Sequence, residues 1–196
     1  MSKKQDKEIV LGNLVSALHL IQKSRDFAFI IPEIRTSLVY ATPWATTPAD
    51  VAGIEGRIAP VDGYPRAAGL PAFGASTHMA HTIFTLREFD PFISATMNLK
   101  CNKEIIEILK QYAAEMGFRF GMLDRNMEPP SAKWRNMGGN WKLRYVVEQA
   151  GGVPPIFYEN EGMGREQLTI LTGKDAVEIT ERALEIAKRY RIQLKA

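Results

Sequence analysis

Five stretches of the chain repeat hydrophobic residues at the spacing of an amphipathic helix. In the last of them, Ile179, Ala183, Ile186 and Tyr190 recur every three or four residues, with charged residues between them. That period places these side chains on one face of a helix. The pattern predicts helices over residues 7–23, 76–89, 103–116, 141–150 and 175–190, with Ile9 on the buried face of the first and Phe89 on that of the second.

Short apolar runs between these helices predict β-strands. Residues 27–31 are apolar and end at Pro32, which is typical of a buried strand. Gly117 is expected to end the third helix, and Asp62–Gly63 is expected to form a turn. Further runs predict strands at residues 37–41, 57–61, 93–99, 118–123, 155–158 and 168–171.

The alternation of helices and strands predicts one α/β domain over residues 1–196, with helices on both faces of a sheet. Some neighbouring strands are joined by turns too short for a parallel crossover, so the sheet is expected to be mixed. Residues 1–10 are polar and are expected to form a flexible tail.

Composition limits the classes of protein that the chain can belong to. Hydrophobic residues make up 45% and charged residues 24% of the 196 residues, which is typical of a folded globular domain. One cysteine, Cys101, excludes an internal disulfide and a cysteine-based zinc site. No apolar run reaches 18 residues and the N-terminus lacks an apolar signal, so we expect a cytoplasmic protein.

The segment from residue 55 to residue 81, EGRIAPVDGYPRAAGLPAFGASTHMAH, combines turn formers, arginines and histidines. It ends in a helix start at Ser76 or Thr77. Polar side chains beside a helix N-terminus can bind an anion, because the first amides of the helix are unpaired. The net charge of +3 suits a phosphorylated small molecule as well as nucleic acid.

Several motifs along the chain resemble the ThiN family. They are FIIPEIRTSLVYA (29–41), GRIAPVDGYPRAAGLPAFGASTHMA (56–80), FGMLDRNMEP (120–129), GGVPPIFYENEGMGRE (151–166) and GKDAVEI (173–179). ThiN is the prokaryotic thiamine-phosphate synthase domain, often fused behind a hydroxymethylpyrimidine kinase and sometimes behind a helix-turn-helix. The resemblance covers nearly all the chain after about residue 10.

The resemblance implies a three-layer α/β/α fold with a mixed sheet, similar to the class II aldolase (AraD-like) fold. It also implies a reaction that joins hydroxymethylpyrimidine diphosphate to hydroxyethylthiazole phosphate, giving thiamine phosphate and pyrophosphate. The family's catalytic arginine and histidine correspond to Arg57 and His78. The family's usual GKEP differs here, where Gly164-Arg165-Glu166-Gln167 stands in its place.

Such a reaction needs cationic groups around phosphate oxygens. Mg²⁺ is the expected cofactor, and the candidate metal ligands are Asp62 and Asp124, with Glu33 also beside a turn. Either aspartate could instead cap its turn. The candidate phosphate-binding residues all lie at turns or at a helix start: Arg35, Arg66, Gly74, Ser76, Thr77, Gly162, Gly164 and Arg165.

Each catalytic candidate has a structural alternative. Arg57 could be a surface residue in a salt bridge, and His78 could be a half-buried histidine with one hydrogen bond. His78 and His81 lie three residues apart, a spacing that permits a shared zinc ion. The sequence offers no clear third ligand, so His81 is interpreted as structural.

Three classes of function follow. The first is a thiamine-phosphate synthase acting on phosphorylated small molecules, with no nucleic-acid or membrane partner and forming a homodimer. The second is a domain that binds thiamine phosphate without turnover, either as a sensor or as the partner of a kinase. The third is a zinc-dependent, aldolase-like enzyme, supported by the implied fold and the histidine pair.

Overall fold

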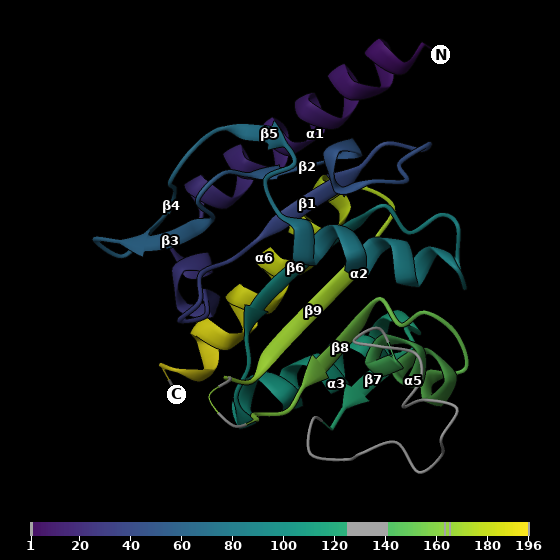
Figure 1. The fold of residues 1–196 in the computed structure, drawn as a ribbon. Helices are drawn as coiled ribbons and strands as arrows, with labels where there is room; N and C mark the ends of the chain where they lie inside the picture. Colours follow the sequence, from purple (N-terminus) through teal and green to yellow (C-terminus); the bar gives the residue numbers. More distant parts are fainter. Residues whose placement is uncertain (1, 125–140, 163, 165, 196) are drawn as a thin grey trace.

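A seven-stranded mixed sheet runs through the middle of the computed structural model (Figure 1), which describes residues 2–124, 141–162, 164 and 166–195. The strands lie in the order β5-β2-β1-β6-β9-β8-β7. Every neighbouring pair is antiparallel except β7 and β8, which are parallel. The expected mixed sheet is confirmed. Its strands are β1 (Leu38–Ala41), β2 (Val51–Ile54), β5 (Pro71–Phe73), β6 (Ala95–Lys100), β7 (Phe120–Leu123), β8 (Ile156–Glu159) and β9 (Leu168–Gly173).

Helices cover both faces of this sheet. Helices α1 (Lys3–Lys23), α3 (Lys103–Met116) and α6 (Ala176–Gln193) pack on one face, in the largest hydrophobic cluster. Helices α2 (Thr77–Arg87) and α5 (Trp141–Ala150) pack on the other (Figure 1). Leu38 and Val39, neighbours on β1, belong to the clusters on opposite faces, as strand alternation requires. The three-layer α/β/α architecture is therefore confirmed.

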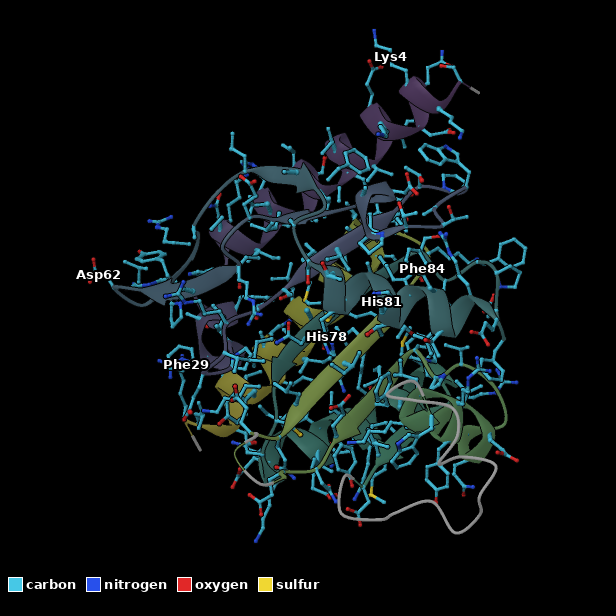
Figure 2. The ribbon with its side chains drawn as sticks, viewed as in Figure 1. Lys4, Phe29, Asp62, His78, His81 and Phe84 are labelled. Atoms are coloured by element: carbon cyan, nitrogen blue, oxygen red, sulfur yellow. The ribbon has the colours of Figure 1, made fainter. Side chains whose placement is uncertain are left out.

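Two strands form a separate hairpin beside the main sheet. Strand β3 (Ile58–Val61) pairs with β4 (Tyr64–Ala67) through the predicted turn at Asp62 and Gly63. An isolated bridge between Thr36 and Ile58 joins the hairpin to the segment before β1. The hairpin thus begins next to the sheet and extends away from it, with Asp62 at the far end (Figure 2).

Several predictions about single elements need correction. Residues 27–31 are not a strand, because residues 26–30 form the 3-10 helix η1 (Asp26–Ile30), whose Phe27 and Ile30 are buried three positions apart. Residues 3–10 are not a tail, because a capping box at Ser2 starts α1 at Lys3. Ile9 is 48% exposed and does not belong to the buried face of α1. Phe89 is 45% exposed and lies beyond the end of α2, which is Arg87 and not residue 89.

Other predicted boundaries are confirmed. Helices α3 and α5 have the predicted bounds, and Gly117 ends α3 in the left-handed conformation at φ 65°. The structure also has the short 3-10 helix η2 (Pro48–Asp50), which follows Thr47 and has Pro48 at its start. Among the described residues, no helix combines the length and the apolar character needed to cross a membrane.

Candidate active site

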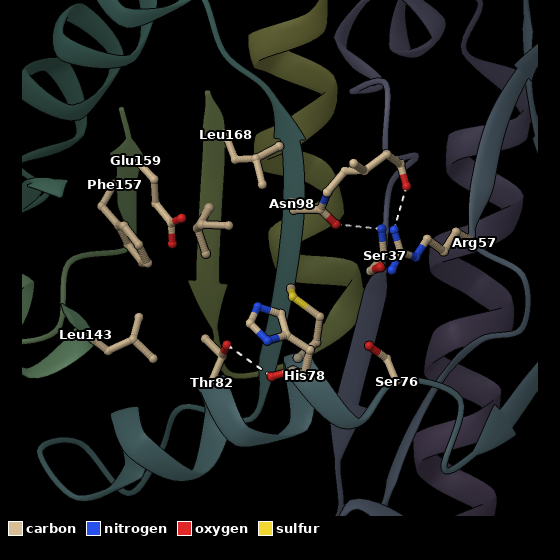
Figure 3. A pocket seen from close by; sticks show the side chains of 13 residues that line it. Ser37, Arg57, Ser76, His78, Thr82, Asn98, Leu143, Phe157, Glu159 and Leu168 are labelled. Carbon is tan, nitrogen blue, oxygen red and sulfur yellow. Dashed lines mark hydrogen bonds between the residues drawn. The ribbon is translucent and has the colours of Figure 1, made fainter. Parts of the chain in front are cut away.

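A pocket lies between the α2–α5 layer and the sheet, and it contains both predicted catalytic residues, Arg57 and His78 (Figure 3). Its volume is about 80 Å³. Typical ligand pockets have at least about 300 Å³, so the described residues enclose room for only part of a substrate. The other lining residues are Ile34, Ser37, Ser76, Met79, Thr82, Asn98, Leu143, Phe157, Glu159, Leu168 and Ile170.

His78 reaches the pocket from the first turn of α2. Ser76 is the N-cap residue, but its side chain makes no capping hydrogen bond, so its hydroxyl is not committed to the helix. The imidazole of His78 lies over the middle of the pocket, and the Thr82 hydroxyl donates to the His78 carbonyl oxygen at 3.4 Å (Figure 3). The helix start therefore places an imidazole and a hydroxyl beside unpaired amides, as an anion site requires.

Helix α2 is held in place at its other end by Arg87. The guanidinium donates to the carbonyl oxygens of Thr42 and Ile93 at 2.8–3.1 Å and to the Ser94 hydroxyl at 2.8 Å. Burial lowers the pKa of Arg87 from its ordinary value. Since these acceptors lie at the ends of β1 and β6, Arg87 fixes the helix that presents His78 against the central strands of the sheet.

Arg57 enters the pocket from a turn rather than from a strand. It was predicted within the strand 57–61, but β3 begins at Ile58 and Arg57 has φ 69°. Its Nη1 donates to the Ile34 carbonyl oxygen at 2.6 Å. A guanidinium has five N–H donors, so this one bond leaves further donors that can face a ligand.

The backbone is strained at Arg57, which lines the pocket, and at Arg35, which follows the lining residue Ile34. Arg35 and Arg57 have φ values of 70° and 69°, which residues with a side chain rarely adopt. They directly precede Thr36 and Ile58, whose amides and carbonyls exchange two hydrogen bonds of 2.9 and 3.0 Å. Such strain costs about 1–3 kcal/mol per residue and persists where surrounding contacts enforce it, often at functional sites.

Four polar residues of the pocket were not predicted from the sequence: Ser37, Thr82, Asn98 and Glu159. Asn98 is 3% exposed and lies in the middle of β6, where its neighbours Met97 and Leu99 are buried on the opposite face. Glu159 ends β8 and faces the pocket across from Arg57 (Figure 3). A polar residue inside an apolar strand was the signal for Asn98, because a buried amide needs hydrogen-bond partners.

Most predicted phosphate-binding residues lie outside the pocket lining. The Gly74 amide donates to the Val51 carbonyl oxygen at 2.9 Å and is not available to a ligand. Arg66 lies on β4 with its guanidinium over the Tyr64 ring, 5.2 Å from the ring centre. Arg35 and Thr77 are exposed and do not line the pocket. Of the phosphate-binding candidates within the described part of the chain, only Ser76 lines it.

The glycine turn and the metal candidates are also placed. Gly164 has φ 67°, as a tight turn requires, but neither it nor Gly162 lines the pocket, and Arg165 lies outside the described residues. Asp62 is at the tip of the β3–β4 hairpin, away from the pocket (Figure 2). Asp124 follows β7, next to Leu123, which pairs with Glu159. The structure therefore brings Asp124, and not Asp62, to the edge of the sheet that bears Glu159.

The second histidine does not join His78 in the pocket. His81 is exposed and stacks edge-on against Phe84, with ring centres 6.1 Å apart (Figure 2). Within the described part of the chain, no group of three histidine, cysteine or acidic residues is arranged to hold a metal ion. Burial raises the pKa of Cys101 to about 11, which keeps this thiol protonated and unreactive near neutral pH.

The structure is thus an α/β protein in which an arginine held in a turn and a histidine at a helix start line one pocket with an apolar floor. Residues 13–185 match the family described as thiamine-phosphate synthase ThiN. The chain belongs to this family. It is 34% identical over 183 residues to "Thiamine-phosphate synthase ThiN" of Methanothermobacter thermautotrophicus, a match that covers 92% of this chain and 94% of the relative.

Two further comparisons connect the chain to kinase fusions. It is 34% identical over 187 residues to "Bifunctional thiamine biosynthesis protein ThiDN" of Methanocaldococcus jannaschii, covering 94% of this chain and 42% of that protein. The crystal structure of a C-terminal domain of phosphomethylpyrimidine kinase superposes with a TM-score of 0.83 at 29% identity, covering 92% of this chain and 99% of that domain. The fold is thus that of a domain which also occurs at the end of longer proteins.

Proposed function

We propose that this chain is a thiamine-phosphate synthase, a transferase that joins hydroxymethylpyrimidine diphosphate to hydroxyethylthiazole phosphate. Membership of the ThiN family supports this assignment. The observation that supports assigning this activity to Arg57 and His78 is that the two residues, which lie on different elements, line one pocket.

The chemistry of the reaction agrees with the groups in that pocket. The thiazole nitrogen attacks the methylene carbon of the pyrimidine, and the bond from that carbon to the diphosphate oxygen breaks. The bonding electrons leave with pyrophosphate, and the nitrogen becomes cationic without losing a proton. No general base is needed, so the rate depends on positioning and on stabilising the charge that develops on the leaving group.

Arg57 and His78 are assigned to that leaving group. Arg57 keeps one N–H on the Ile34 carbonyl oxygen and directs the remaining donors at phosphate oxygens. His78 and the Ser76 hydroxyl add donors from the start of α2, where the helix dipole also favours negative charge. The apolar side chains of Met79, Leu143 and Phe157 offer a surface for the aromatic ring.

Mg²⁺ is the proposed cofactor. Proteins usually hold this ion with one or two carboxylates together with substrate phosphates. Glu159 is the carboxylate that lines the described pocket, so it is the residue proposed to hold an ion whose coordination the diphosphate completes. Asp124 follows the neighbouring strand β7 and is not among the residues that line the pocket. When bound, the ion would neutralise charge on the leaving diphosphate.

The setting of the protein is proposed from the same chemistry. Its phosphorylated substrates are charged and do not cross membranes freely, so we place the protein in the cytoplasm. The homodimer expected from the sequence stays a prediction, which sedimentation of the purified chain measures directly.

Replacing the assigned residues tests the proposal. Arg57→Ala and His78→Ala should each lower kcat by about 100- to 1000-fold, because each removes a donor that acts on developing charge. His81→Ala is the matched control, since it removes a histidine from the same helix but outside the pocket. Product formation is followed by chromatography, with EDTA added in a parallel reaction to test the metal.

In this experiment the control variant should retain the wild-type rate, and EDTA should abolish turnover. An Arg57→Ala or His78→Ala enzyme that is as fast as the His81→Ala control would refute the assignment of the site.

A further inference from the structure

The orientation of Arg57 depends on a short turn that precedes β1. Arg57 Nη1 donates to the Ile34 carbonyl oxygen at 2.6 Å, and Ile34 lies in a turn closed by the hydrogen bond from the Arg35 amide to the Pro32 carbonyl oxygen at 2.9 Å. An arginine side chain is long and flexible, so the acceptor at its end fixes where the other donors point. The position of the Ile34 peptide therefore decides where Arg57 can contact a ligand.

A carboxylate from a distant part of the chain holds this turn. Glu166 Oε2 accepts the Glu33 amide at 3.1 Å, and Glu166 Oε1 accepts the Ile34 amide at 2.8 Å. Hydrogen bonds to an ionised acceptor are stronger than neutral ones. Because both oxygens of one carboxylate bind successive amides, they fix the direction of the turn as well as its position.

Asn98 holds the same turn from its other end. Its Nδ2 donates to the Arg35 carbonyl oxygen at 3.1 Å. Its Oδ1 accepts the Ser37 amide at 2.7 Å, as Figure 3 shows. The two side chains therefore bracket Arg35, whose φ of 70° is strained. This is the kind of contact that must enforce an unfavourable backbone conformation.

We infer that Glu166 is a positioning residue for Arg57, acting through the Ile34 peptide. The inference rests on the proposed function, because it assumes that Arg57 binds the diphosphate. It also gives Glu166, which follows Gly162 and Gly164 in the chain, a role in the site that does not depend on a glycine contacting phosphate.

Binding of inorganic pyrophosphate, measured by calorimetry, tests this role without requiring turnover. Glu166→Ala should weaken binding by about 10- to 100-fold, because it lets the Arg57 guanidinium move. A misplacement of about 1 Å in a site can cost about 100-fold. Arg57→Ala should weaken it at least as much. The double variant should bind no more than about twofold more weakly than Arg57→Ala alone, because residues that act through one contact are not additive.

The matched control is Asp50→Ala. Asp50 Oδ2 also accepts two successive backbone amides, those of Thr46 and Thr47 at 3.3 and 3.0 Å, but it lies outside the pocket. This variant should bind pyrophosphate as the wild type does. If Glu166→Ala does not fold, Glu166→Gln keeps one acceptor oxygen and should give an intermediate loss of affinity.

Three outcomes would overturn the inference. They are wild-type affinity in Glu166→Ala, losses that multiply in the double variant, and a wild-type chain that does not bind pyrophosphate. A wild type that binds pyrophosphate with the predicted pattern but forms no thiamine phosphate would reject the proposed function and leave the positioning role intact.

Discussion

At the residue scale, the site combines a needed side chain with an unfavourable backbone. Arg57 and Arg35 occupy left-handed backbone positions that a glycine would adopt without strain. Position 57 nevertheless carries an arginine. Its guanidinium lines the pocket and donates a hydrogen bond to the Ile34 carbonyl oxygen. Stability is thus lowered at the position where the proposed chemistry needs a cation.

Alanine variants are usually more stable than glycine variants at the same position. The strain at Arg57 predicts the reverse order of stability at this position. Arg57→Gly and Arg57→Ala both remove the side chain, but the glycine variant should be more stable by about 1 kcal/mol because φ is positive. Both should show the loss of about 100- to 1000-fold in kcat that is expected for Arg57→Ala. Thermal or urea unfolding of the purified variants measures the difference.

Arg66 provides the comparison. It is an exposed arginine on β4 that is absent from the positive-φ residues, so glycine there should be less stable than alanine. Finding the same order at positions 57 and 66 would contradict the claim that strain at Arg57 affects stability.

At the scale of elements, the site depends on how α2 is anchored at both ends. His78 lies in its first turn, and Arg87 in its last turn binds two carbonyl oxygens and a hydroxyl near the ends of β1 and β6. Helix α2 also packs on β1 through Met79, Ala80 and Ile83. The position of α2, and therefore of His78, is thus set by the central strands of the sheet.

Replacing Arg87 by Met should destabilise the protein by about 2–4 kcal/mol, because buried carbonyl oxygens lose charge-assisted donors. Denaturant unfolding measures this change, with the exposed Lys4→Met as a control that should stay within about 0.5 kcal/mol of the wild type. An Arg87→Met protein of wild-type stability would show that α2 is fixed by its apolar contacts alone.

The sequence predicted those elements whose periodicity is strong. The stripe Ile179, Ala183, Ile186 and Tyr190 is buried on α6 as expected. Strands β2, β4 and β5 were missed because they are short and contain glycine or proline, which usually mark turns. The segment around Phe27 was misassigned because an apolar run of five residues fits a strand and a buried helical turn equally well.

For the site, local patterns pointed to an anion-binding helix start, and the family resemblance selected Arg57 and His78. The structure places both in one pocket. Asn98, Glu159 and Glu166 could not be selected from the sequence, because their roles depend on contacts with residues far away in the chain.

At the scale of the whole molecule, the pocket is assembled from nearly the full length of the chain. Ile34 and Arg57 come from the first third, His78 and Asn98 from the middle, and Phe157 and Ile170 from the last third. The sheet order explains this, because β1, β6, β9 and β8 are adjacent in space while distant in sequence. A fragment that lacks β8 and β9 would lose one wall of the site.

The central claim is that this pocket catalyses a condensation and does not merely bind its product. The most direct measurement is the amount of thiamine phosphate and pyrophosphate formed when the purified protein is given hydroxymethylpyrimidine diphosphate, hydroxyethylthiazole phosphate and Mg²⁺. The account predicts equal amounts of the two products, in many turnovers per protein chain. A folded protein that binds thiamine phosphate tightly in calorimetry but forms neither product would contradict it.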